Sequence, residues 1–129
     1  MSTESARSEP RPVGPEVVLD VDLRSGVFVL VLANTGTSTA FEPRVSFATR
    51  LIGLQGELVV SELPIWTSLA MLRPGSQVDV LLDAQAARRD PEDRQFTATV
   101  TYRDGSGRGI ERAFTHDLEA CVGLPSLLP

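Results

Sequence analysis

The stretch QFTATVTYR, residues 95–103, decides the fold, because apolar and polar side chains alternate along most of its length. Its apolar members share one face: Phe96, Ala98, Val100 and Tyr102. A period of two residues is typical of a β-strand with one face in a core and the other in water. The glycine-rich residues 104–109 follow as a hairpin loop, so residues 110–118 are expected to return antiparallel.

The same alternation recurs on the N-terminal side of this strand. It is found in residues 17–23, 40–48 and 77–83. Residues 27–33 are apolar at every position, as in a central strand that is covered on both faces. The turn NTGTS follows, in which Asn34 and Gly36 are residues able to adopt positive φ. Seven or eight short strands with turns between them predict an all-β fold of two packed antiparallel sheets.

Some segments depart from simple alternation. Pro43 lies inside a predicted strand and has no N–H, which indicates an edge position or a bulge. Residues 57–60 are expected to form a short strand. Residues 61–75, SELPIWTSLAMLRPG, predict a bent strand or a crossover between sheets that ends at a Pro–Gly turn. Residues 84–94, AQAARRDPEDR, are able to form about one helical turn before Pro91.

The chain of 129 residues is the right length for a single domain. Residues 1–15 are rich in Ser, Glu, Arg and Pro and are expected to form a flexible tail, because they offer little apolar surface to bury. Residues 16–119 are predicted to form the sandwich, and residues 120–129 an apolar C-terminal tail.

Three stretches carry a resemblance to a known group of domains: LANTGTSTAFEPRVSF (32–47), LRPGSQVDVLLD (72–83) and FTATVTYRDGSG (96–107). They resemble bacterial immunoglobulin-like or fibronectin-type-III-like domains, and the resemblance spans residues 17–118. It implies an immunoglobulin-like β-sandwich, and by analogy a binding or spacer module. The cysteine pair of antibody domains is missing, so no functional residue carries over.

Composition argues against several partners and compartments. The net charge is −5, and all 12 basic residues are arginine. An acidic chain is poorly suited to nucleic acid or to anionic lipid. The single cysteine allows no intrachain disulfide. The N-terminal residues do not resemble a signal peptide, and no apolar run approaches the ~20 residues of a membrane span, so a cytoplasmic location is expected.

Catalytic and metal-binding patterns are weak. His116 is the sole histidine, and its neighbour Asp117 faces the opposite side of a strand. One histidine and Cys121 cannot make a closed zinc site. Asp20 and Asp22 share a strand face, the one geometry that suggests calcium. The sequence therefore predicts no catalytic, cofactor or metal residues and a protein that is not an enzyme.

Two features indicate interaction surfaces. The first is the outer face of the doubly apolar strand 27–33, which needs a cover from residues 51–72, from a partner or from a second copy. The second is the tail, whose Leu124, Leu127 and Leu128 could fold back on the domain, insert into a partner or remain loose.

Trp66 and its neighbour Ile65 complete the set of predicted contact residues. Trp66 is expected in the core or half-buried, and it is the best anchor for a partner if its segment is an exposed rim.

The resulting hypothesis is a non-enzymatic module for protein–protein interaction or a structural accessory role. Its partner would be another protein or a second copy of the chain. The alternative is a small-ligand domain that holds a carbohydrate or calcium in loops at one end of the sandwich.

Overall fold

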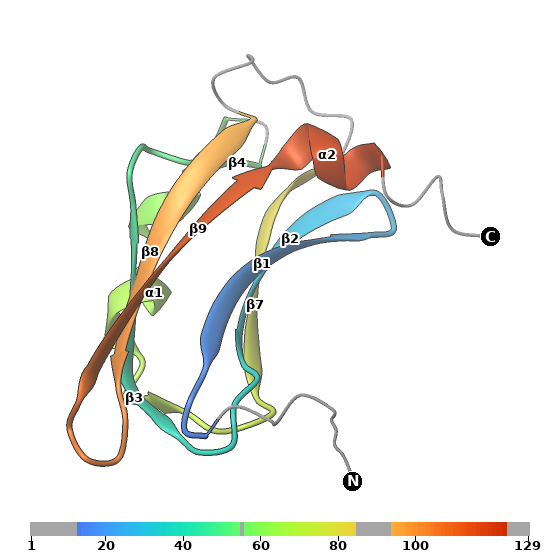
Figure 1. Ribbon diagram of the computed structural model, residues 1–129. Helices are drawn as coiled ribbons and strands as arrows, with labels where there is room; N and C mark the ends of the chain where they lie inside the picture. Colours follow the sequence, from blue (N-terminus) through green and yellow to red (C-terminus); the bar gives the residue numbers. More distant parts are fainter. Residues whose placement is uncertain (1–12, 55, 85–93, 124–129) are drawn as a thin grey trace, which may run out of the picture.

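The computed structural model describes residues 13–54, 56–84 and 94–123. Two antiparallel sheets pack face to face, and a small two-stranded sheet, β4-β5, accompanies them (Figure 1). One sheet has the strand order β1-β2-β7 and the other the order β6-β3-β8-β9. The bounds are β1 Val17–Arg24, β2 Val27–Asn34, β3 Ala40–Phe47, β6 Met71–Leu72, β7 Gln77–Ala84, β8 Gln95–Arg103 and β9 Gly109–Asp117. The predicted all-β fold of two packed antiparallel sheets is confirmed.

The core lies between the sheets and is filled by the alternating side chains of both. In β8 every second residue is buried, as the 95–103 pattern predicted. In β2 the residues that face the core are Phe28, Leu30 and Leu32. Residues Val29 and Val31 lie on the opposite side of the same strand, outside the core cluster, although each is at most 9% exposed.

The segment between β3 and β6 is helical in part, so the bent strand that was one alternative for residues 61–75 is wrong there. The other alternative, a crossover between sheets, is confirmed, because the chain passes from β6 in one sheet to β7 in the other through the turn at Pro74 and Gly75. Its elements are β4 Ile52–Gly53, β5 Leu58–Val59, η1 Val60–Glu62 and α1 Ile65–Ser68. Pro64 occupies the N-cap of α1 with φ −59°, a value that its ring imposes and that a helix accepts. The short strand expected at residues 57–60 is present as the two residues of β5.

Strand β3 contains the bulge that Pro43 predicted. Its pairing with β8 shifts between Phe41 and Arg44. Glu42, inside the shift, has a positive φ of 51°. The bulge lets Pro43 turn its side chain into the interior without interrupting the ladder on either side.

Asn34, at the end of β2, forms a buried corner that ties several segments together. Its side chain is 1% exposed, and its Oδ1 accepts hydrogen bonds from the amides of Glu16 (3.1 Å) and Gly36 (2.9 Å). Its Nδ2 donates to the carbonyls of Ser38 and Leu72, each at 2.8 Å. The amide makes all four of the hydrogen bonds that it is able to make, two as acceptor and two as donor. It thereby links the start of β1, the NTGTS turn and β6 to one side chain.

Neither Asn34 nor Gly36 uses the positive φ that it is able to adopt, and the left-handed residues of the described chain lie elsewhere. Gly36 is required for a different reason. A Cβ at this position would lie 2.5 Å from the Glu16 amide nitrogen and closer still to the Gly14 carbonyl oxygen. The segment before β1 packs directly on the turn, with Thr37 N donating to Gly14 O at 2.8 Å.

Both ends of the domain differ slightly from the predicted boundaries. Ordered contacts begin at Gly14, close to the expected start at residue 16, and residues 1–12 lie outside the described residues. At the other end, residues 118–123 form the helix α2 (Leu118–Gly123), where a strand end and an irregular tail were expected. The helical turn expected at residues 84–94 lies outside the described residues for most of its length.

Replacing Gly36 by Ala should destabilise the fold by about 2 to 3 kcal/mol, because the new methyl group collides with backbone that cannot move aside. Gly105→Ala is the matched control, since a Cβ there meets nothing within 4 Å and its expected cost is below about 0.5 kcal/mol. Urea unfolding of both variants measures the difference, and equal stabilities would contradict the packing described for the corner.

Candidate functional site

The outer side of the β1-β2-β7 sheet carries an apolar strip that we call the valine face. It is formed by Val27, Val29, Val31 and Leu81, together with Leu54 from the loop after β4. Leu81 pairs with Val29 across the strands and is 51% exposed. The three valines of the strip form the outer face that was expected for the doubly apolar strand.

The valine face contains a hollow at the end where β2 begins and β7 ends. Val27, Leu54 and Leu81 line it, and its volume is about 310 Å³. The amide of Leu54 donates to the carbonyl of Leu82 at 2.9 Å, which fixes the β4–β5 hairpin along the edge of β7. The hollow is thus a product of the fold, because two separate segments of the chain are hydrogen-bonded at its rim.

Arg24 lies across the middle of the valine face. From the end of β1 its Nε donates to Asp22 at 2.8 Å, and its Nη1 donates to Asp79 on β7 at 2.7 Å. Because β2 lies between these two strands, the side chain must cross over the valines to reach Asp79. The aliphatic part of an arginine covers apolar surface in this way while its head stays in water.

Residues 51–72 supply only part of the cover that was one alternative for this face, namely Leu54 and Glu57 beside Val27. Their buried side chains, Leu51, Val60, Trp66 and Leu72, belong to the core cluster between the sheets, and Val29 and Val31 do not. The Arg24 bridge spans β2 from β1 to β7. Leu81 and Leu54 stay exposed beyond its reach.

Carboxylates surround the valine face and give it a negative rim. They are Asp20, Asp22, Asp79 and Glu57. The hydrogen bond from Arg24, followed by one from Gln77, holds the pKa of Asp79 below its ordinary value, and the same contact raises the pKa of Arg24. An apolar centre with an acidic rim suits an apolar segment that also carries basic side chains.

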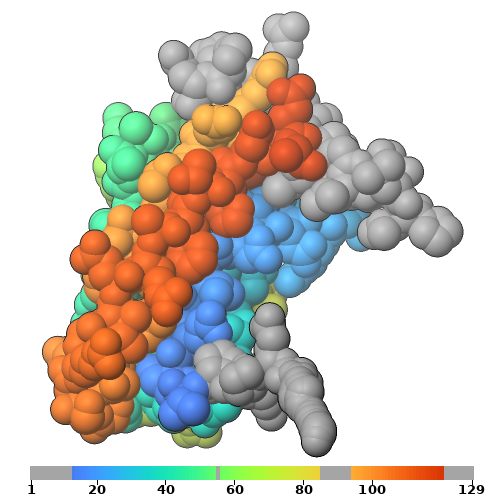
Figure 2. All heavy atoms as spheres, viewed as in Figure 1, coloured from blue at the N-terminus to red at the C-terminus, as the bar shows by residue number. Residues whose placement is uncertain are grey.

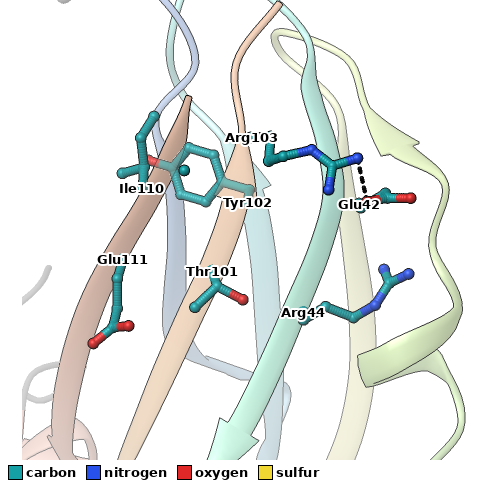
Figure 3. Close-up of a pocket in the computed structure, with 8 residues that line it drawn as sticks. Glu42, Arg44, Thr101, Tyr102, Arg103, Ile110 and Glu111 are labelled. Atoms are coloured by element: carbon teal, nitrogen blue, oxygen red, sulfur yellow. Dashed lines mark ion pairs between the residues drawn. The ribbon is translucent and has the colours of Figure 1, made fainter. Parts of the chain in front are cut away.

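The outer side of the other sheet is of a different kind, and we call it the threonine face. It consists of Ser46, Thr97, Thr99, Thr101, Ala113 and Thr115. The hydroxyls of Thr97 and Thr115 lie 2.9 Å apart and share a hydrogen bond. Figure 3 shows one end of this face, where Arg44, Thr101 and Glu111 project from three neighbouring strands around a wide hollow of about 420 Å³.

Trp66 lies in the core, one of the two positions that the sequence left open. Its indole is 2% exposed, its Nε1 donates to the carbonyl of Val60 at 2.7 Å, and its ring meets Phe47 edge-on at 5.3 Å. Ile65 is half-buried against the same cluster. A partner contact through either residue stays an untested prediction. Leu124, Leu127 and Leu128 lie outside the described residues.

His116 bridges the two sheets at the open side of the sandwich. Figure 2 shows β9 and β1 side by side there, in orange and blue. The imidazole Nε2 donates to the carbonyl of Leu19 at 2.7 Å, since a carbonyl can only accept. Asp117 faces away, as predicted, and accepts a hydrogen bond from the Glu119 amide. The observed contacts of His116 are structural.

Within the described part of the chain, no group of three or more His, Cys, Asp or Glu side chains is arranged to hold a metal ion. The helices described here are also too short and too polar to cross a bilayer.

The chain belongs to a family described as a domain of unknown function (DUF8453), whose model matches residues 2–121. Neither the curated proteins nor the solved structures gave a match. The family membership therefore defines a class of domain without adding an activity, and function has to be argued from the two sheet faces.

Replacing Arg24 by Gln should raise the pKa of Asp79 toward its ordinary value, because the largest cause of its depression is removed. The ion pair exists above the ordinary carboxyl pKa and is lost as the pH falls through the lowered one. Carboxyl carbon NMR of Asp79 against pH measures both midpoints, with Arg108→Gln in the hairpin loop as control. An unchanged Asp79 midpoint in Arg24→Gln would mean that the bridge does not form in solution.

Proposed function

We propose that the protein is a non-enzymatic β-sandwich module that binds another protein through the valine face. The observation that carries the proposal is the hollow beside Leu81 and Leu54, where two large apolar side chains stay exposed next to a folded, complete core. Exposed apolar surface beside an acidic rim is typical of a protein-interaction site.

The sheet edges favour binding through a face. Arg112 stands on the inward side of the edge strand β9 and stays exposed, a position that discourages pairing with another strand. His116 occupies the open edge of β1 through the carbonyl of Leu19. The β4–β5 hairpin lies along β7, and β6 is two residues long. Strand addition from a partner is therefore disfavoured at each edge.

The strand order supports the resemblance to immunoglobulin-like and fibronectin-type-III-like domains. If the strands are lettered by their place in the chain, β1, β2 and β7 correspond to A, B and E, and β3, β8 and β9 correspond to C, F and G. The short β6 pairs with β3, so the sheets have three and four strands. Domains of this architecture commonly serve as binding modules, in agreement with the proposal.

A capture experiment tests this function. The domain is used as bait in a lysate of its source organism, and bound proteins are quantified for the wild type, for Leu81→Glu and for the control Ala113→Glu on the opposite sheet. We expect at least one protein to be retained by the wild type and the control and to be reduced about tenfold or more by Leu81→Glu, which places a charge in the hollow.

Retention of every captured protein by Leu81→Glu would contradict binding through the valine face. Thermal stabilisation of the domain by Ca²⁺ or a saccharide, with no captured protein, would favour the small-ligand alternative instead.

A further inference from the structure

The threonine face combines a neutral, flat centre with charged flanks of opposite sign. Its three central rows run across β3, β8 and β9, and the middle row joins Ser46, Thr99 and Ala113. These side chains are small and at least partly exposed. A flat face of short side chains lets another surface approach closely, which a face of long charged side chains does not.

The row at one end carries the charges. Arg44 on β3 pairs with Thr101 on β8, and Thr101 pairs with Glu111 on β9, so a cation and an anion stand on either side of a short threonine. Figure 3 shows the three side chains in this order across the hollow. Any surface that complements this row must present an anion and a cation in the reverse order at the same spacing.

A second copy of the chain presents that order. A two-fold axis parallel to β8, lying between two facing threonine faces, exchanges the positions of β3 and β9 while keeping each row at the same height. Arg44 of one copy then stands over Glu111 of the other, twice in the complex, and the threonines of β8 meet along the axis. We propose that the protein forms a homodimer through its threonine faces, independently of the partner proposed for the valine face.

The remaining charges at that end do not oppose the arrangement. Arg103 lies on β8, next to the axis, where two copies would bring it near its own counterpart. It is paired with Glu42 on β3, and this neutralises it and draws the guanidinium away from the axis. Arg44 keeps its orientation through hydrogen bonds from Nη1 to the carbonyls of Pro43 and Leu69, so it is held at the flank.

The size of the face sets the expected affinity. Three long strands spaced about 4.8 Å apart and roughly nine residues long give a face of about 14 by 27 Å. Each copy would bury about 400 Å², which places the interface at the small end of specific contacts, where association is weak or transient. The dimer should therefore appear at concentrations of about 100 μM and above, and it would display the two valine faces on opposite outer sides.

Sedimentation equilibrium at 20 to 500 μM tests the dimer. We expect Arg44→Glu and Glu111→Arg each to raise the dimer dissociation constant about tenfold or more, because each puts like charges opposite each other twice. The double variant R44E/E111R should recover the wild-type constant, and an equimolar mixture of the two single variants should form a heterodimer.

Two further variants keep the test independent of folding effects. Ala113→Arg leaves both charges in place and should abolish dimerisation by filling the flat centre, while the control Arg108→Glu in the hairpin loop should leave the constant unchanged. A wild-type protein that is monomeric at 500 μM overturns the proposal. So does a dimer that survives the two single reversals, or a double variant that fails to recover.

Discussion

The structure depends on one buried amide. Asn34 accepts two backbone hydrogen bonds, donates two more, and through its own main chain binds the turn before β7, with Gly75 N donating to its carbonyl at 2.8 Å. Glu16 leads into one sheet and Leu72 belongs to the other, so the side chain joins both layers at one end. A buried polar side chain with all its hydrogen bonds made adds specificity to how the layers align, beyond the fit of the apolar core.

The Asn34 corner and the apolar core occupy the interior, and the proposed contacts rest on the two outer faces. The two faces differ in chemistry: one is apolar with an acidic rim and a single arginine lying across it, and the other is hydroxylated with opposite charges on its flanks. Trp66, whose residue type made it the best candidate anchor for a partner, is buried in the core instead. There its indole N–H donates to the carbonyl of Val60.

The sequence predicts the layers well and the corners poorly. Alternation identifies β8 and the core side of β2, because burial acts on each residue separately. It fails in residues 61–68, where Pro64 and local hydrogen bonding make a helical turn that buries Trp66. Alternation also carries no information on why position 36 needs glycine, because the close approach of Gly14 and Glu16 joins segments distant in sequence. Arg44 and Glu111 stand in one row with Thr101 only because of the register of β3, β8 and β9, and alternation alone does not specify that register.

The central claim is that the Asn34 amide holds the two sheets in register and so builds both outer faces. Equilibrium unfolding of Asn34→Ala tests it most directly, with Thr35→Ala, an exposed neighbour, as control. The loss of four buried hydrogen bonds predicts a fall of about 3 kcal/mol in the free energy of unfolding, against less than about 0.5 kcal/mol for the control. An Asn34→Ala protein as stable as the control would contradict the claim.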